Sequence, residues 1–361
     1  MESLFYDINR TYEENYKRGP IGLAKLKKPL LKATKPKFKF LGFPVNMPFG
    51  VPAGPLLNSK FVKEAFDFGF DVNHYKTQRS VVFPYNQFPN ILFVDIDGNL
   101  TLAKAEKPLI GRRYTRKKST KISITNSFGN PCRGPEVWQR DMKKALSYTK
   151  DGQLLIASVV GTIQKGFTEG EYFDDFAYTA KLAKETGIKI IEINLSCPNV
   201  TNEGVLCYSQ EACEKITRKT KEAIGDTPLL VKVGYYSHKQ EELLRKIIKK
   251  ITPFASGIAA INTIPAPVIN LQGKQALPGP NRLKSGICGY AIKWAAIDMV
   301  KRLSLIREKL KADYAIIGVG GVMTGEDYRE FRNVGADVVQ SATGAMWNPY
   351  LAHEIWQKEN I

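Results

Sequence analysis

Eight short runs of apolar residues, rich in valine and isoleucine, alternate with longer amphipathic segments along most of this chain. The runs lie at residues 48–51, 71–76, 154–159, 189–194, 229–232, 257–262, 314–319 and 337–340. Runs that are apolar throughout are typical of parallel strands covered on both faces. Segments with a period near 3.6 lie between most of them, at 173–186, 212–224, 240–251 and 295–310. This alternation predicts a (β/α)8 barrel rather than an open sheet.

Three stretches interrupt the alternation and predict additions to the barrel. Residues 1–44 are basic and predict a helical extension with a linker, which leaves residues 45–361 as the barrel domain. Asp97-Gly98, within the interruption at 83–125, predicts a hairpin turn. Residues 264–290 are rich in proline and glycine and predict a long loop at the C-terminal face of the barrel, where active sites of this fold lie.

The composition is that of a globular protein with a strongly basic surface. Of its 361 residues, 43% are hydrophobic and 24% are charged, which suits one barrel domain with a sizeable core. No apolar run approaches the roughly 18–20 residues that span a bilayer, and the N-terminus lacks a signal-peptide pattern. We therefore expect a cytoplasmic protein. The net charge of +18 favours an anionic membrane surface, an acidic partner or nucleic acid, and its alternative is a solvated basic surface.

Cysteine and histidine usage argues against a metal centre. The five cysteines are odd in number and form no Cys-x-x-Cys pair, and the three histidines are far apart in the sequence. A disulfide framework or a zinc site would need closer or paired spacing. No metal ligand is predicted.

Polar residues end several of the predicted strands at the face where barrels place their active sites. They are Lys76, Asn194, Lys232 and Asn262, on the second, fourth, fifth and sixth strands. A lysine at the end of a buried strand is unfavourable unless it meets an anion or a cofactor. Gly320 and Gly321 follow the seventh strand and Thr343 follows the eighth, and these two loops form the usual phosphate site of a barrel.

The segment Glu192-Ile193-Asn194-Leu195-Ser196-Cys197-Pro198-Asn199 is the most specific motif, and it resembles the strand-four signature of the dihydroorotate dehydrogenase family. The resemblance covers about residues 45–358. It includes, in the same order, Tyr75-Lys76-Thr77, Asn126-Ser127-Phe128-Gly129, Val231-Lys232, Ile261-Asn262-Thr263, Ser285-Gly286-Ile287-Cys288-Gly289 and Gly318-Val319-Gly320-Gly321.

The resemblance implies an FMN-dependent enzyme that oxidises dihydroorotate to orotate in pyrimidine biosynthesis. Cys197 matches the base that removes a proton from the substrate ring, and Lys76 matches a lysine between flavin and substrate. A cysteine at this position is nearer the soluble class of the family than the membrane-associated class. The substrate-binding positions implied are Asn126, Ser127, Phe128, Gly129, Asn194, Asn199, Asn262 and Thr263. The cofactor-binding positions implied are Ala53, Gly54, Lys76, Thr77, Lys232, Gly286, Gly320, Gly321 and Thr343.

Elementary chemistry is consistent with these roles. Oxidation of a saturated C–C bond beside a carbonyl needs a base for one hydrogen and a hydride acceptor for the other, and a flavin is such an acceptor. A thiol serves as the base when its pKa approaches the working pH. A lysine beside the flavin stabilises its anionic reduced form, and amide side chains read the donors and acceptors of a pyrimidine edge.

Several departures from the family pattern keep alternatives in view. Asn130 stands where the soluble class usually has leucine, residues 340–345 contain alanine at a usual glycine position, and the loop after Cys197 lacks the usual proline-rich lid. Cys207 lies near the position of the acid in related dihydropyrimidine dehydrogenases. The alternatives are an oxidoreductase for another uracil-like ring, a tRNA dihydrouridine synthase and a non-catalytic flavin-binding protein. Family members are often homodimers, and fumarate, NAD through a partner or quinone could each serve as electron acceptor.

Overall fold

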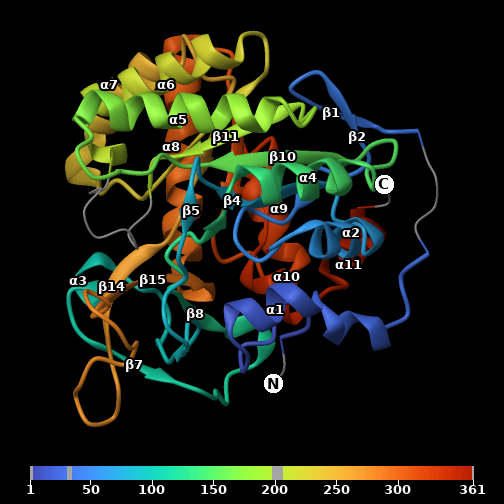
Figure 1. Cartoon of the computed structure of the whole chain (residues 1–361). Coiled ribbons are helices and arrows are strands. Elements are labelled where there is room, and N and C mark those ends of the chain that lie inside the picture. Colours follow the sequence, from blue (N-terminus) through green and yellow to red (C-terminus); the bar gives the residue numbers. More distant parts are fainter. Residues whose placement is uncertain (1–2, 31–34, 197–205, 360–361) are drawn as a thin grey trace.

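A closed sheet of eight parallel strands forms the centre of the molecule (Figure 1). The computed structural model describes residues 3–30, 35–196 and 206–359. The strand order is β3 (Phe49–Gly50), β17 (Val338–Gln340), β16 (Ala315–Val319), β13 (Gly257–Ala260), β12 (Leu229–Val233), β11 (Ile190–Asn194), β10 (Leu154–Val159) and β4 (Val72–Gln78). The N–H groups of Asp71 and His74 donate to the carbonyls of Phe49 and Val51, which joins the two ends of the sheet. The predicted (β/α)8 barrel and its eight strands are confirmed.

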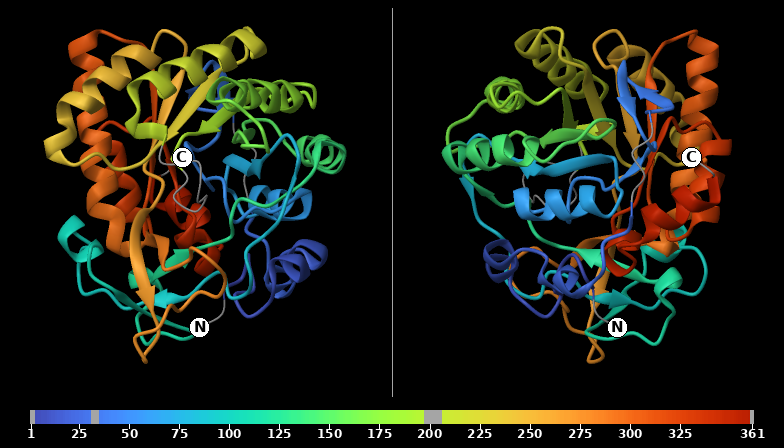
Figure 2. Two further views of the ribbon diagram at one scale, coloured as in Figure 1. Left: turned by 60° about the vertical axis from the view of Figure 1, so that its left-hand side comes forward. Right: turned by 90° about the vertical axis from the view of Figure 1, so that its right-hand side faces the viewer.

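Helices cover the outside of the barrel (Figures 1 and 2). They include α2 (Ser59–Asp67), α4 (Pro135–Leu146), α5 (Glu169–Lys184), α6 (Gln210–Ile224), α7 (Glu241–Ile251), α8 (Lys293–Leu310), α9 (Gly325–Asn333) and α11 (Leu351–Glu359). Helix α7 shows why these segments are helical, because Leu244, Ile247, Ile248 and Ile251 share one buried face. Helix α5 begins at a capping box in which Thr168 and Glu171 satisfy each other's backbone N–H groups. The four predicted helices correspond to α5 through α8.

A second sheet lies at one end of the barrel, at the lower left of Figure 1. It contains β14 (Ile264–Ile269), β15 (Lys284–Gly289), β8 (Ser123–Asn126), β6 (Phe93–Val94) and β7 (Leu109–Arg112). The prediction of one long loop over residues 264–290 is therefore wrong. Ile264, Ala266 and Val268 are buried at every second position of β14. The prolines occupy the intervening positions, so this proline-containing segment still presents one apolar face to the core.

The hairpin predicted at Asp97-Gly98 is also wrong. Strands β6 and β7 do pair antiparallel, but residues 95–108 connect them and contain helix α3 (Leu102–Ala105). Leu100 is fully buried and its N–H donates to the carbonyl of Ala291, which ties the connection to a distant segment. The Thr101 side chain then caps α3. Long-range packing has replaced the tight turn that the dipeptide favours.

The interior of the barrel is layered because every second residue of a strand faces inward. At the N-terminal end lies an apolar layer that includes Val72, Ile190, Leu230 and Val338, closed by Phe40 and Val45 from the hairpin β1 (Phe38–Phe40) and β2 (Phe43–Val45). Two positions further along β4, β11 and β17 come His74, Glu192 and Gln340, all buried. Lys76 and Asn194 follow after another two positions, at the C-terminal end.

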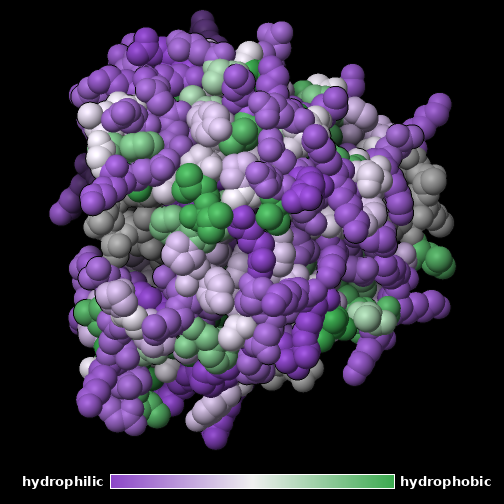
Figure 3. All heavy atoms as spheres, viewed as in Figure 1, coloured by the Kyte–Doolittle hydropathy of each residue, from purple (hydrophilic) through white to green (hydrophobic). Residues whose placement is uncertain are grey.

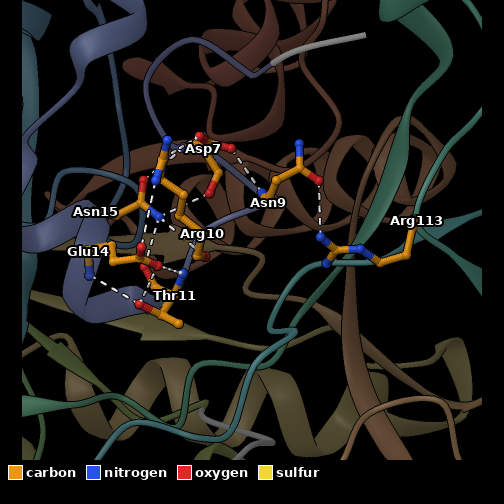
Figure 4. A network of polar contacts seen from close by, with 7 residues as sticks. All are labelled: Asp7, Asn9, Arg10, Thr11, Glu14, Asn15 and Arg113. Carbon is orange, nitrogen blue, oxygen red and sulfur yellow. Dashed lines mark hydrogen bonds and ion pairs between the residues drawn. The ribbon is translucent and has the colours of Figure 1, made fainter.

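The N-terminal segment packs directly on the barrel. Phe5, Tyr6 and Ile8 belong to the same buried cluster as barrel residues, ahead of α1 (Tyr12–Arg18) and the 3-10 turn η1 (Ile21–Lys25). Figure 4 shows the polar network that shapes this segment, in which the Asn15 amide accepts from the N–H of Asp7 (2.8 Å) and donates to its carbonyl (3.0 Å). A second loop is tied to it through Arg113, whose guanidinium donates to Asn9 (3.0 Å).

The surface is predominantly hydrophilic on the face shown in Figure 3, where apolar side chains are scattered in small groups. Among the helices of the described residues, none combines the length and the apolar character that crossing a membrane requires.

A buried carboxyl at the N-terminal end of the barrel predicts how stability changes with pH. Burial raises the pKa of Asp71 to about 7, against opposing hydrogen bonds that include one from the Gln153 amide (3.1 Å). Between about pH 4 and pH 7 the folded protein keeps a proton that the unfolded chain releases, so this group's contribution falls as pH rises. In denaturant titrations, the free energy of unfolding of Asp71→Asn, compared with that of the wild type, should rise by roughly 1–3 kcal/mol as the pH is raised from 5 to 8. An identical pH dependence of the two proteins would contradict this assignment.

Candidate active site

Two adjoining cavities lie between the C-terminal ends of the barrel strands and the second sheet. The larger has about 760 Å³ of empty space, its opening to solvent included, and the barrel contributes Lys232, Asn262 and Gly320 to its wall while the second sheet contributes Asn126 and Cys288. The smaller has about 460 Å³ on the same basis. Both share Ala53, Gly54, Asn126, Phe128, Lys232 and Asn262, so a molecule in one cavity would contact a molecule in the other.

The residues implied as cofactor-binding gather mainly around the larger cavity. Ala53, Gly54, Lys232, Gly320, Gly321 and Thr343 line it, whereas Lys76 and Thr77 line the smaller one. Gly286 lies on β15, where a Cβ would stand 2.2 Å from the Thr263 hydroxyl. The Gly320 and Gly321 backbones have φ angles of +134° and +76°, a region that glycine adopts without strain.

The residues implied as substrate-binding gather mainly around the smaller cavity. Asn126, Phe128, Gly129, Asn194 and Asn262 line it, and Thr263 lines the larger cavity. The Asn262 amide donates to the carbonyl of Ser196 and to Asn194 Oδ1 (3.3 Å). These bonds tie the end of β11 to the end of β13. Cys197 and Asn199 lie outside the described residues.

Ser127 has a supporting position behind the cavity rather than on its wall. Its hydroxyl accepts from Nε and Nη2 of Arg282, at 3.1 and 3.0 Å. Arg282 is almost fully buried and also donates to the carbonyls of Gln87 (2.8 Å) and Pro89 (3.1 Å). Burial lowers the pKa of this guanidinium to about 10. The arginine therefore holds the loop that carries Asn126 and Phe128 against two other loops.

Two residues that shape the site, Tyr6 and Arg282, were not identified from the sequence. Tyr6 lines the larger cavity, and its ring packs edge-on against Phe128 with 5.3 Å between centroids. Arg282 acts from a loop more than 150 residues away from Ser127. No local pattern marks either residue, because each reaches the site only through long-range packing.

Asn130, the residue that departs from the family pattern, lines the smaller cavity beside Lys76. Its backbone φ is +50°, a left-handed conformation that asparagine tolerates far better than leucine. The Asn130 carbonyl accepts from the buried Arg79 (3.0 Å), and its side-chain oxygen accepts from Lys76 Nζ (3.4 Å). The local backbone thus accounts for asparagine at this position, and the amide gives the Lys76 ammonium a neutral partner.

The larger cavity fits a flat, anionic group such as FMN. A Cβ on Gly54 would meet no atom within 4 Å, so the backbone opens directly into the cavity there. Lys232 supplies a cation to the lining of the same cavity. The Thr263 hydroxyl is buried and has no hydrogen-bond partner within the described part of the chain. A buried polar atom of this kind is normally paired, and a ligand in the cavity could pair it.

A (β/α)8 barrel with cavities at the C-terminal ends of its strands has the arrangement typical of an enzyme of this fold. The sequence model of the family described as Dihydroorotate dehydrogenase matches residues 101–359. A protein named Dihydroorotate dehydrogenase from Dictyostelium discoideum is 36% identical over 366 residues, which cover 98% of this chain and 97% of that protein. The chain belongs to the dihydroorotate dehydrogenase family, whose members are FMN-dependent oxidoreductases acting on CH–CH groups.

More distant relatives match about seven tenths of the chain. Two proteins named Dihydroorotate dehydrogenase B (NAD(+)), catalytic subunit are 27% identical in Staphylococcus carnosus and 29% identical in Petrotoga mobilis. The first match covers 70% of this chain and 76% of that protein, and the second covers 71% and 77%.

The contact between Gly286 and Thr263 gives a direct test of the cavity wall. Because a Cβ at Gly286 would lie 2.2 Å from the Thr263 hydroxyl and 2.9 Å from its Cβ, Gly286→Ala must displace Thr263. We expect a loss of about 1–3 kcal/mol in stability and markedly weaker flavin retention during gel filtration. Gly170→Ala on α5 is the matched control, since its nearest neighbour would be 3.8 Å away. Full flavin retention by Gly286→Ala would show that Thr263 does not border the cofactor.

Proposed function

We propose that this chain oxidises dihydroorotate to orotate, the reaction of pyrimidine biosynthesis that its family name denotes. The observation that carries the proposal is the smaller cavity, which is lined by two lysines, by Asn130 and by three asparagines of the implied substrate-binding set, and which shares part of its wall with the cofactor-sized cavity. FMN, when bound, supplies the acceptor for the hydride that leaves the substrate. Membership of the family supports the same reaction.

The three asparagines are suited to recognise a pyrimidine ring. They are Asn126 of β8, Asn194 of β11 and Asn262, which is the second residue after β13. Each amide offers both a donor and an acceptor. We assign them to the ring's carbonyl and N–H groups. The Lys76 ammonium is nearly buried at the same wall and offers a positive charge to an anionic substrate. A ring that carries a carboxylate therefore suits this cavity better than a neutral one.

We assign proton removal from the substrate ring to the Cys197 thiolate. Ser196, the residue before it, is buried at the end of the β11 segment, and its carbonyl accepts from the Asn262 amide. This bond anchors the chain next to the smaller cavity at the point where Cys197 follows. The thiolate takes the proton from the ring carbon as the hydride leaves the neighbouring carbon, so that the C–C bond becomes a double bond.

An oxidoreductase for another uracil-like ring would favour Cys207 as the catalytic acid. The position of Cys207 counts against this role. Cys207 is fully buried, and the hydroxyl of Tyr236 donates to its carbonyl. Burial raises the pKa of its thiol to about 11. A thiol packed in the core, among Ser196 and Tyr208 around Gly234, is poorly placed for proton exchange with a substrate.

Anaerobic mixing with dihydroorotate tests the reaction and the base together. Dihydroorotate should bleach the flavin absorbance of the wild type rapidly, whereas Cys197→Ala should be slower by a factor of about 100 or more, because it lacks the base. Cys213→Ala, at a buried cysteine of α6, is the matched control and should react like wild type. If dithionite bleaches the bound flavin of the wild type and dihydroorotate does not, the substrate assignment is wrong.

We also propose that the protein is cytoplasmic and forms a homodimer. We propose further that its basic N-terminal region docks on an anionic membrane surface. Lys35, Lys37 and Lys39 are exposed in this region, and the whole chain carries a net charge of +18. Reversing these three lysines to glutamate should lower binding to vesicles that contain phosphatidylserine by several fold at low salt, with neutral vesicles as the control. This test is cleaner than truncation, because Phe5 and Tyr6 belong to the core. Equal binding before and after charge reversal would refute docking through these lysines.

A further inference from the structure

A buried polar layer crosses the barrel directly beneath the two cavities. On β4, His74 lies two residues before Lys76, and on β11, Glu192 lies two residues before Asn194. Lys76 and Asn194 line the smaller cavity, so His74 and Glu192 face the same interior one layer deeper. Barrel interiors are usually filled by branched apolar side chains. A histidine and a carboxylate at this depth have no part in the reaction described above.

The hydrogen bonds of this layer define the tautomer of His74. The Gln340 side-chain nitrogen donates to the carbonyl of Val72 (2.9 Å), which can only accept, and the same nitrogen lies 2.8 Å from His74 Nδ1. Nδ1 is therefore an acceptor, and a neutral ring carries its proton on Nε2. His74 Nε2 lies 3.2 Å from Glu192 Oε2. The protonated nitrogen of the imidazole thus lies within ion-pair distance of the carboxylate.

Glu192 keeps its negative charge in spite of its depth. Burial by itself raises the pKa of this carboxyl, but the nearby His74 and Lys232, together with the Ser158 hydroxyl, outweigh burial and lower it. Lys232 lies on β12 and is paired in the parallel register with Asn194 of β11. Asn194 is one inward position closer to the cavities than Glu192, so Lys232 lies at that same higher level. Lys232 lines both cavities. The carboxylate is therefore a buried counter-charge to the lysine that faces the cofactor-sized cavity.

We propose that Glu192, oriented by His74, tunes the reduction potential of the bound flavin by offsetting the positive charge of Lys232. This inference rests on the proposed position of the flavin beside Lys232. A cation at that wall stabilises the negative charge of a reduced flavin, and a carboxylate one layer below weakens that stabilisation. Glu192 is a positioning residue in this scheme, since it acts through Lys232 and the local electrostatic potential without contacting the substrate.

The reduction potential of the flavin is measured by equilibrating the purified holoenzyme with reference dyes. The reduction is slow and enzymatic, and no dihydroorotate is present. Glu192→Gln removes the negative charge and keeps the side-chain shape, so the ratio of reduced to oxidised flavin at a fixed potential should rise on the order of tenfold. Glu192→Met fills a similar volume without a polar group and should cause the same shift, which keeps the test available if the glutamine variant does not fold.

Two controls separate charge from structural damage. Glu192→Asp keeps the carboxylate and should stay within about twofold of the wild-type ratio. Asp71→Asn removes another buried carboxyl, in the residue before β4, and should leave the ratio unchanged at about pH 9, where Asp71, with a pKa of about 7, is ionised. An unchanged or lowered ratio in both neutral Glu192 variants would overturn the proposal. Because the titration uses no dihydroorotate, a wrong substrate assignment would appear only in the bleaching experiment and not here.

Discussion

The closure of eight parallel strands into a barrel is the constraint on which the rest of this structure depends. Once β4 is hydrogen-bonded back to the β3 segment, every inward side chain must share its level with those of the neighbouring strands. Side chains on one strand then change level in steps of two residues. The depth of a residue in the barrel, and hence its distance from the cavities, follows from its position along its strand.

This layering explains why one interior holds both an apolar plug and a charged layer. Val72 and Ile190 exclude water at the N-terminal end, while His74 and Glu192 lie between that plug and the cavities. Burying an ion in such a place is unfavourable unless partners surround it. His74, Lys232 and Ser158 lie around Glu192 and lower the pKa of its carboxyl, and of these three residues Lys232 lines both cavities.

The barrel alone does not build the site. The second sheet supplies Asn126 and Cys288, Arg282 holds the loop after β8, and Tyr6 arrives from the N-terminal segment. The same features account for the departure at Asn130, where a left-handed backbone between two buried cations favours asparagine over leucine. Cofactor and substrate residues thus reach one place from strand ends, a separate sheet and the chain terminus.

The sequence by itself determined the elements whose signal is local. Apolar runs and helical periods located eight strands and four helices, and the lysines and asparagines at strand ends marked the cavity face, because parallel strands in a barrel all end at one rim. Only the tertiary structure decided the rest. Asp97-Gly98 became part of a longer connection, residues 264–290 became two strands, and Tyr6 reached the cavity. In each case contacts between distant segments outweighed the local preference, and no window of sequence contains those contacts.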